Sequence, residues 1–407
     1  MMENDVVIVS AVRTPFGKFD GVLKFTHSFD LATSVLKEVV DRINLDPKEV
    51  DEVYYGTCIP AEYALQLNVP ARIVTLAAGF PEDNISLTID RACCSSLTAV
   101  RLGYRAIKAG DAEIVVASGA ENMSNTPLIA DAKKARWGSR IGPIQLEDVL
   151  FELGYSRSGY SPLAVDTGEV AVEYGVSREE QDKWALRSHL KWFKAFEEGK
   201  FKVGEELMPL KVPQKRGDAV ILERDESPRD NVSSEKMAKL KTIYGSPTVT
   251  AGNAPGMSSG ATAIVLMSRK KAESLGLKPM ATIEACECAA GNPKYIATVP
   301  AQAIKKMLKK KEQTIEDVDI IEINEAFAAV TLVSLKQLAN DDPEKYQVLK
   351  EKTNVNGGAI AMGHPVGASG ARITMTTMYE LMRRGGGRGV AAICGGLSQG
   401  EAIMLRV

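Results

Sequence analysis

The sequence has few cysteines, no C-x-x-C pair, no long apolar run and no excess of charge of either sign. Its six cysteines, at positions 58, 93, 94, 286, 288 and 394 of 407 residues, are too sparse for a disulfide scaffold and lack the spacing of common zinc sites. No apolar run approaches the ~18–20 residues needed to cross a bilayer. A net charge of −2 provides no basic field for nucleic acid. These absences predict a protein without a bound metal, a membrane segment or a nucleic-acid partner.

The composition and the first residues predict a globular protein of the cytoplasm. With 45% hydrophobic residues, the 407-residue chain can form two or three folded units. Residues 1–5 contain acids where a secretory signal has cations, and Arg13, Thr14 and Pro15 interrupt the apolar run that follows. Sparse cysteines agree with a reducing compartment.

Two stretches of the chain repeat one order of elements. In each, an amphipathic helix precedes an apolar strand, and a turn of small residues then leads into a second helix and a second strand. The first copy runs through residues 31–43, 50–56, 92–107 and 113–119, and the second through 303–310, 318–324, 363–382 and 389–396. The repeat predicts an internally duplicated α/β fold with mainly parallel strands in mixed sheets that pack in layers.

The segment between the two copies differs in character, because it has more charge and more loops. We therefore expect an inserted loop domain at 121–250. The first half would comprise 1–120 and about 251–275, and the second half 276–407.

Cys93 is a candidate nucleophile because it follows a predicted strand at 85–89 and precedes a predicted helix. Unpaired N–H groups at a helix start stabilise negative charge, so this position favours a thiolate. Free cysteines are more often small buried side chains, and that role is the alternative for both Cys93 and Cys94.

His364 is a candidate general base. The chain has three histidines, at 27, 189 and 364, and only the last lies in a glycine-dense segment, 363–370, at a helix start. Glycines allow a ligand to approach the backbone closely, and a histidine held there can accept a proton. The alternative is a packed or turn-stabilising histidine.

Cys394 and Asn324 stand at the ends of two further predicted strands. Open α/β folds present catalytic groups beyond the carboxyl ends of their strands, and a duplicated fold brings such ends from both halves to one crevice. Cys93, His364, Cys394 and Asn324 are therefore predicted to share one site.

Longer motifs give the chain a resemblance to a known family. The motifs are VIVSAVRTPFG at 7–17, NEAFA at 324–328, NGGAIAMGHPVGASGAR at 356–372 and CGG at 394–396. The whole chain resembles thiolases of the acetyl-CoA acetyltransferase or 3-ketoacyl-CoA thiolase type. That resemblance implies two similar α/β halves with a loop domain in the first, and no cofactor other than coenzyme A as a co-substrate.

The resemblance also assigns roles to the four candidate residues. Cys93 would carry the acyl group as a thioester after His364 activates its thiol, and Cys394 would exchange a proton with the α-carbon of acetyl-CoA. Asn324, through a water, and His364 would hold the substrate thioester oxygen. Backbone N–H groups of Cys93 and Gly396 would form the other oxyanion hole.

Coenzyme A is expected to contact Arg229, Ala251, Pro255, Gly256 and Phe327. A solvated loop arginine is the alternative for Arg229.

The sequence departs from the family pattern at four places. Cys94 and Ser96 stand where the family usually has glycine, Leu397–Ser398 replaces a glycine, and Pro255 replaces a serine that touches the pantetheine arm.

The sequence thus predicts a reversible condensation of two acetyl-CoA to acetoacetyl-CoA and CoA, or cleavage of short 3-ketoacyl-CoA, by a homodimer or homotetramer. Three alternatives remain open. They are a non-catalytic thiolase-like lipid carrier or scaffold, a decarboxylating condensing enzyme, and a cysteine hydrolase. Cys394 distinguishes the predicted enzyme from the last two, because a condensing enzyme of that kind pairs its cysteine with two histidines, or with histidine and asparagine, and a hydrolase needs no second thiol.

Overall fold

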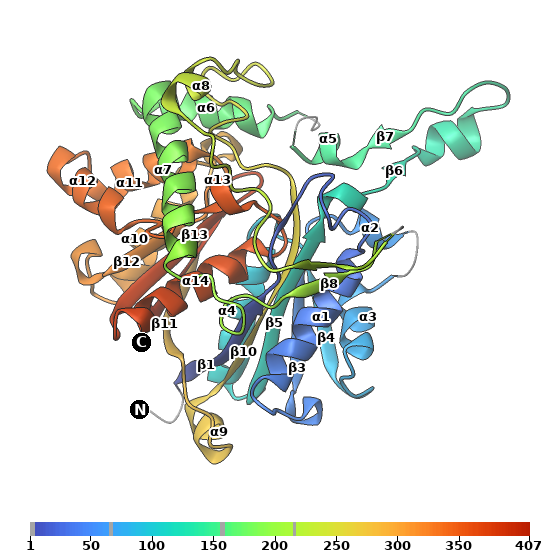
Figure 1. Ribbon diagram of the computed structural model, residues 1–407, viewed down its shortest axis with the longest axis vertical. Helices are drawn as coiled ribbons and strands as arrows, with labels where there is room; N and C mark the ends of the chain where they lie inside the picture. Colours follow the sequence, from blue (N-terminus) through green and yellow to red (C-terminus); the bar gives the residue numbers. More distant parts are fainter. Residues whose placement is uncertain (1–4, 65–67, 155–158, 215–216) are drawn as a thin grey trace.

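The chain folds into strands and helices that follow its hydrophobic pattern (Figure 1). The computed structural model describes residues 5–64, 68–154, 159–214 and 217–407. The strands are β1 (Val6–Arg13), β2 (Gly17–Lys18), β3 (Glu52–Gly56), β4 (Ile85–Ile89), β5 (Ile114–Asn122), β6 (Leu128–Ile129), β7 (Glu147–Asp148), β8 (Leu210–Val212), β9 (Val220–Leu222), β10 (Ser258–Ser268), β11 (Ala281–Ala290), β12 (Ile320–Ile323), β13 (Arg388–Gly395) and β14 (Gln399–Arg406). The helices are α1 (Ser28–Asp41), α2 (Ala61–Ala64), α3 (Pro70–Ala77), α4 (Ser95–Ala109), α5 (Val149–Gly154), α6 (Leu163–Glu173), α7 (Arg178–Glu197), α8 (Ser234–Ala238), α9 (Arg269–Ser274), α10 (Val299–Lys310), α11 (Ala328–Ala339), α12 (Pro343–Lys352), α13 (Ala359–Met362) and α14 (Ser369–Arg383). Short helical turns are η1 (Pro47–Glu49), η2 (Met123–Asn125), η3 (Lys133–Gly138), η4 (Pro293–Tyr295) and η5 (Ile315–Asp317).

One ten-stranded mixed sheet runs through both halves of the chain. Its order is β12-β13-β14-β11-β1-β10-β5-β3-β4, with β2 paired to β10. The two halves meet where β1 pairs with β11 at Val7–Thr282 and Ile8–Ala281. The predicted α/β class with mixed sheets is confirmed.

The expected dominance of parallel strand pairs is wrong. Parallel pairs are β3 with β4, β3 with β5, and β12 with β13. The long central strands β1, β10, β11 and β14 pair antiparallel with their neighbours. Continuous apolar sequence indicates that a strand is buried on both faces but does not give the direction of its partner. The burial of the central strands was therefore predicted correctly, and their direction was not.

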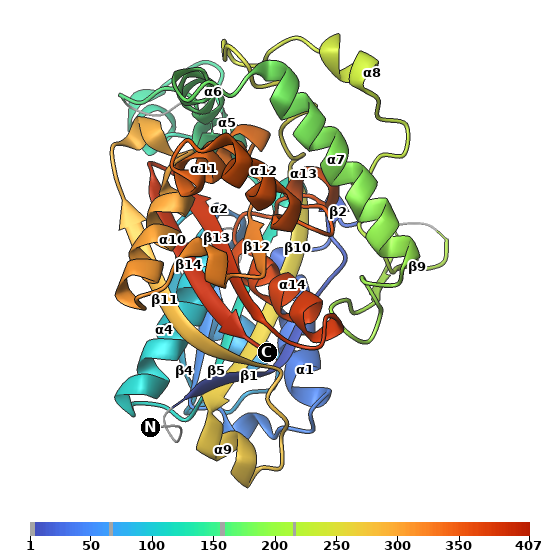
Figure 2. The same ribbon diagram turned by 90° about the vertical axis from the view of Figure 1, so that its left-hand side faces the viewer.

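Helices cover both faces of each half of the sheet (Figures 1 and 2). Helices α4 and α14 pack against each other in a central layer between the two halves. Helix α1 covers the outer face of the first half, and α10 with α11 covers the outer face of the second. Three apolar clusters fill the spaces between these layers. The central layer places the start of α4 beside the start of α14.

The segment between β5 and β10 carries β6 to β9 and α5 to α8. The part around β6 and β7 extends away from the sheet in Figure 1, and α7 packs on α11 and α13. A buried ion-pair group of Arg13 with Glu206 and Asp225 fixes the segment to β1. The predicted boundaries of the three units stay a prediction.

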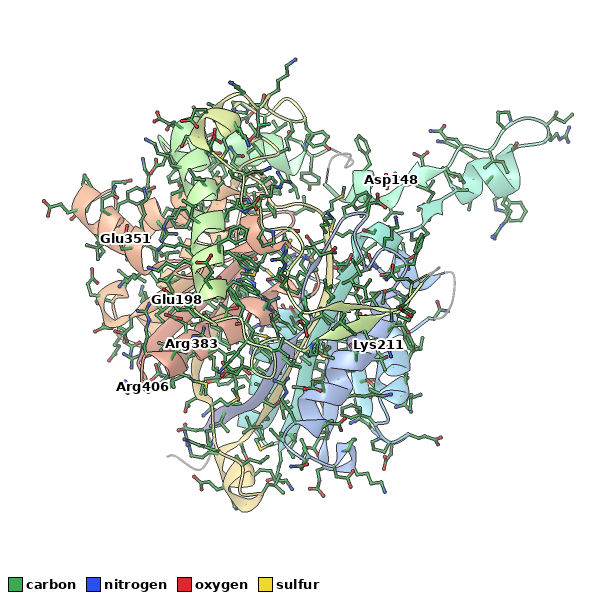
Figure 3. The ribbon with its side chains drawn as sticks, viewed as in Figure 1. Asp148, Glu198, Lys211, Glu351, Arg383 and Arg406 are labelled. Carbon is green, nitrogen blue, oxygen red and sulfur yellow. The ribbon has the colours of Figure 1, made fainter. Side chains whose placement is uncertain are left out.

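Exposed charged side chains include Glu198, Glu351 and Arg406, which are labelled in Figure 3. Among the described residues, no helix combines the length and the apolar character needed to cross a membrane.

Candidate active site

The starts of α4 and α14 touch at the centre of the molecule. The backbone N–H of Ala371 donates to Oγ of Ser96 at 3.0 Å. A Cβ on Gly370 would lie 2.4 Å from the backbone nitrogen of Leu97, so this contact requires glycine. The loops that precede the two helices, one with Cys93 and the other with His364, are therefore held side by side.

Of the two adjacent thiols, Cys93 is the accessible one. Cys93 is partly exposed, whereas Cys94 is buried and its Sγ lies 3.8 Å from the carbonyl oxygen of Ile393. Burial raises the pKa of the Cys94 thiol well above its ordinary value. Ala92, just before this pair, has a φ of 49°, a strained conformation of the kind found at functional turns. The structure thus favours Cys93 over Cys94 as the nucleophile.

The serines after the two cysteines join parts of the site. Oγ of Ser95 accepts from the N–H of Arg91 at 2.9 Å and donates to the carbonyl oxygen of Ala92 at 2.6 Å. Ser96, at a position where the family usually has glycine, supplies the hydrogen bond to α14. This departure therefore adds a polar contact between the two halves.

Cys394 is the penultimate residue of β13, next to the Cys93 loop. A Cβ on Gly395 would lie 3.0 Å from both the carbonyl oxygen of Arg91 and Sγ of Cys94, which shows how closely the loop packs on this strand end. Burial, and then the neighbouring Cys93 thiol, raise the pKa of Cys394 well above its ordinary value. Cys394 is therefore a neutral thiol at rest, close to Cys93.

Gly396 begins the tight turn between β13 and β14. The next two residues, Leu397 and Ser398, both have a φ of 60°, in the left-handed region where glycine and asparagine are preferred. The departure noted in the sequence therefore places backbone strain beside a predicted oxyanion-hole residue.

The hydrogen bonds around His364 fix its proton. Its Nδ1 lies 2.6 Å from Oγ of Ser369, and that hydroxyl donates to the carbonyl oxygen of Pro365 at 2.8 Å. Since the hydroxyl proton is directed to Pro365, Oγ accepts from Nδ1–H, and Nε2 carries the free lone pair. Burial, and then the charge of Arg372, lower the pKa of His364 to about 3. The ring is a neutral base.

Asn324 follows β12 and faces His364. Its side-chain nitrogen lies 3.5 Å from both ring nitrogens, and its oxygen accepts from Arg372 at 3.0 Å. Arg372 also pairs with Glu322 at 2.6 Å. Because arginine only donates, it fixes the amide with its NH₂ toward His364, where it can donate to a substrate oxygen or a water.

A cavity of about 550 Å³ lies beside the segment that leads to His364. Its lining includes Arg229, Ala251 and Gly256, three of the five residues expected to contact coenzyme A, but neither Pro255 nor Phe327. The exposed Arg229 lies on its rim, and its backbone N–H donates to Nδ1 of His189 at 3.2 Å.

Ser258 connects the cavity to the loop that carries His364. Its Oγ donates to the carbonyl oxygen of Gly256 at 2.7 Å and accepts from the N–H of His364 at 3.0 Å. The coenzyme contacts themselves stay a prediction.

Sequence reasoning missed the residues that orient the base and the amide. Ser369 and Arg372 lie in the motif that carries His364, and their small spacing from it at a helix start was the available signal. Ser258 is 106 residues away in the chain, and no local pattern indicates it.

The comparisons with known proteins cover the full chain. The family model "Thiolase, N-terminal domain" matches residues 6–270, and "Thiolase, C-terminal domain" matches residues 277–407. An acetyl-CoA acetyltransferase of Cupriavidus necator is 41% identical over 98% of both chains, and one of Syntrophomonas wolfei is 39% identical over 99% of both. The crystal structure of human mitochondrial 3-ketoacyl-CoA thiolase superposes with a TM-score of 0.91 at 35% identity over 100% of both chains. The chain belongs to the thiolase family.

Proposed function

We propose that this thiolase condenses two acetyl-CoA to acetoacetyl-CoA and CoA, and in reverse cleaves short 3-ketoacyl-CoA, through a thioester on Cys93. The observation that carries the proposal is the meeting of two thiols, Cys93 and Cys394, beside a neutral His364 and an oriented Asn324. Full-length relatives named acetyl-CoA acetyltransferase support the same reaction class.

In the first half-reaction, Cys93 takes the acetyl group. Nε2 of His364 accepts the thiol proton while Sγ attacks the carbonyl carbon of acetyl-CoA. The bond from that carbon to the coenzyme sulfur breaks, and the proton passes from His364 to the departing coenzyme thiolate. The backbone N–H groups of Cys93 and Gly396 stabilise the oxyanion.

In the second half-reaction, a carbon–carbon bond forms. The Cys394 thiol first passes its proton to Nε2 of His364. The resulting thiolate takes a proton from the methyl group of a second acetyl-CoA, and the enolate oxygen accepts hydrogen bonds from Asn324 and from Nε2–H of His364. The carbanion attacks the acyl carbon, the bond from that carbon to Cys93 breaks, and the Cys93 thiolate takes the proton from His364. In cleavage, the neutral Cys394 thiol gives the proton back, and burial keeps it in that form.

The surroundings of Cys93 favour short acyl groups. Cys58, Ile59 and Val366 form a buried apolar cluster, and Cys93, Met123 and Leu150 pack against it. Packed apolar walls leave little room for a long chain beside the thioester.

A cytoplasmic location and a homodimer or homotetramer are also part of the proposal. β4 is an edge strand on which Ile85 and Leu87 are 61% and 45% exposed, and an apolar edge of this kind favours pairing with a second copy. Light scattering coupled to size-exclusion chromatography will measure the mass.

The purified protein should be assayed with acetyl-CoA alone, and with CoA plus acetoacetyl-CoA or longer 3-ketoacyl-CoA. We expect acetoacetyl-CoA formation and faster cleavage of the short substrate. Mass spectrometry after brief exposure to acetyl-CoA should find one acetyl group on peptide 92–101, at Cys93. Acetylation at Cys94, or at neither cysteine, would remove the assignment.

A further inference from the structure

Glu325 is a fully buried carboxylate directly after Asn324. Its Oε1 accepts from Nε1 of Trp184 and Nδ2 of Asn354, both at 2.9 Å. Its Oε2 accepts from Oγ of Ser188 at 2.8 Å and from the N–H of Ile360 at 3.0 Å. All four of these donors are neutral groups. Together they hold the carboxylate by hydrogen bonds from several directions.

The donors come from three separate parts of the chain. Trp184 and Ser188 lie one turn apart on α7, in the segment between β5 and β10. Asn354 also accepts from the N–H of Ile323 at 2.8 Å and donates to its carbonyl oxygen at 2.9 Å, and Ile323 is the last residue of β12. Ile360 lies in α13. Glu325 therefore joins α7, the end of β12 and the segment that leads to His364.

The packing around the carboxylate is close. Ser188 also accepts from the N–H of Gly358 at 2.9 Å, and a Cβ on Gly358 would lie 2.5 Å from Cδ of Glu325. The backbone thus passes directly over the carboxylate just before α13, and α13 ends one residue before Gly363. A shift of the carboxylate would move Asn324 through the chain and His364 through α13.

The same helix also reaches the proposed coenzyme site. His189 follows Ser188, lines the cavity and accepts from the backbone of Arg229. Helix α7 therefore contacts Glu325 through Trp184 and Ser188, and the cavity through His189.

We propose that Glu325 is a positioning residue that sets the spacing between the Asn324 amide and the His364 ring and fixes both to α7. The inference rests on the proposed function, because it assumes that these two groups hold the substrate oxygen. Glu325 itself touches no reacting atom.

The primary test is Glu325→Gln, which keeps the shape of the side chain but places an NH₂ group against donors. Misplacement of catalytic groups by about 1 Å costs about 100-fold in rate. We expect kcat for acetoacetyl-CoA cleavage to fall about 10–100-fold when it is normalised to the fraction of enzyme whose Cys93 can be acetylated. KM for CoA should change less than about threefold. Trp184→Phe and Ser188→Ala each remove one donor and should give smaller losses. Adding either to Glu325→Gln should cause little further loss.

Glu206→Gln is the matched control. Glu206 is also a fully buried carboxylate that fixes the segment between β5 and β10, through Arg13, but it lies outside the proposed site. It should lower the melting temperature and leave kcat per active site unchanged well below that temperature. Wild-type kcat in Glu325→Gln, or an equal loss in Glu206→Gln, overturns the proposal. If Glu325→Gln does not fold, Trp184→Phe and Ser188→Ala carry the test, and wild-type kcat in both of these variants overturns the proposal.

A second measurement does not depend on turnover. The three histidines allow the ring signals of ¹⁵N-histidine-labelled protein to be assigned by single substitutions. Glu325→Gln or, failing that, Ser188→Ala should shift the His364 ring signals and leave those of His27 in place. Unchanged His364 signals would contradict the inference. If the wild type itself forms no acetoacetyl-CoA, the proposed function fails, while the ring signals still report whether Glu325 positions His364.

Discussion

The hydroxyl of Ser369 lies between His364 and Pro365, accepting from the ring Nδ1 at 2.6 Å and donating to the Pro365 carbonyl oxygen at 2.8 Å. Because Pro365 takes the only hydroxyl proton, Ser369 keeps the proton of His364 on Nδ1 and leaves Nε2 free as the base. A residue five positions after the base thus determines its tautomer.

Ser369→Ala should therefore lower the rate of Cys93 acetylation. A positioned general base contributes about 10²–10⁴-fold, and loss of its orienting partner should remove part of this, about 10–100-fold. Ser369→Thr retains the hydroxyl and should keep more activity than the alanine variant. Stopped-flow release of CoA from acetyl-CoA measures the step, and equal rates in the alanine variant and the wild type would contradict the assigned tautomer.

Stability should fall as the solution becomes acidic, because His364 stays neutral in the folded chain. Its pKa is lowered to about 3, whereas a histidine in the unfolded chain has a pKa near ~6.5. Between these values the unfolded state binds a proton that the folded state does not, so the free energy of unfolding decreases as pH falls from ~6.5 toward 3. His189, whose pKa burial lowers to about 4, acts in the same direction.

Urea unfolding of the wild type and of His364→Asn between pH 4.5 and 7.5 checks this prediction. One such group contributes at most about 1.4 kcal/mol per pH unit, and the variant should lose that part of the slope. An unchanged slope would show that His364 is not neutral in the folded state.

Local elements could be predicted from the sequence, whereas strand direction could not. The strands expected at 50–56 and 85–89 are β3 and β4, and the helix expected from residue 31 is α1, because burial of one face leaves a periodic pattern in the residues themselves. The antiparallel partners of β1 are about 250 to 275 residues away in the chain. No pattern within β1 specifies them.

For the candidate site, too, local features could be predicted from the sequence, whereas tertiary contacts could not. Motifs predicted Cys93, Asn324, His364 and Cys394, since each stands at the end of a strand or the start of a helix. The polar contacts that orient them arise from tertiary packing. Glu325 stood next to Asn324 in a quoted motif, but its role depends on donors 29 to 141 residues away, which the sequence does not relate to it.

Ser398→Gly should stabilise the protein. Ser398 has a φ of 60°, and among the described residues its buried Oγ has no hydrogen-bond partner. The left-handed conformation costs a non-glycine residue about 1–2 kcal/mol, and the greater freedom of glycine in the unfolded state offsets about 0.4–1 kcal/mol. Chemical unfolding should show a net gain of about 1 kcal/mol. Ser398→Ala removes the hydroxyl but keeps the strain, so a gain as large as that of glycine would refute strain as the cause.

The two thiols should be separable by mutation. If Cys93 is the nucleophile and Cys394 only exchanges a proton with carbon, Cys394→Ala should still be acetylated by acetyl-CoA, because thioester exchange at Cys93 needs only His364 as the proton acceptor. It should fail to form acetoacetyl-CoA, since no group remains to take the α-proton of the second acetyl-CoA. A positioned base contributes about 10²–10⁴-fold, and the loss should be of that order. Cys93→Ala should lose both steps.

Cys94→Ala is the matched control, because Cys94 is a third thiol at the same place, buried against β13 and outside the proposed chemistry. It should retain both acetylation and condensation to within about tenfold, since replacing a small buried side chain costs stability more than rate. Mass spectrometry of peptide 92–101 and an assay of acetoacetyl-CoA formation follow the two steps separately. Equal loss of acetylation in the Cys93 and Cys394 variants would show that Cys394 is needed for the first step. Near-normal condensation in Cys394→Ala would refute its role as the carbon acid/base.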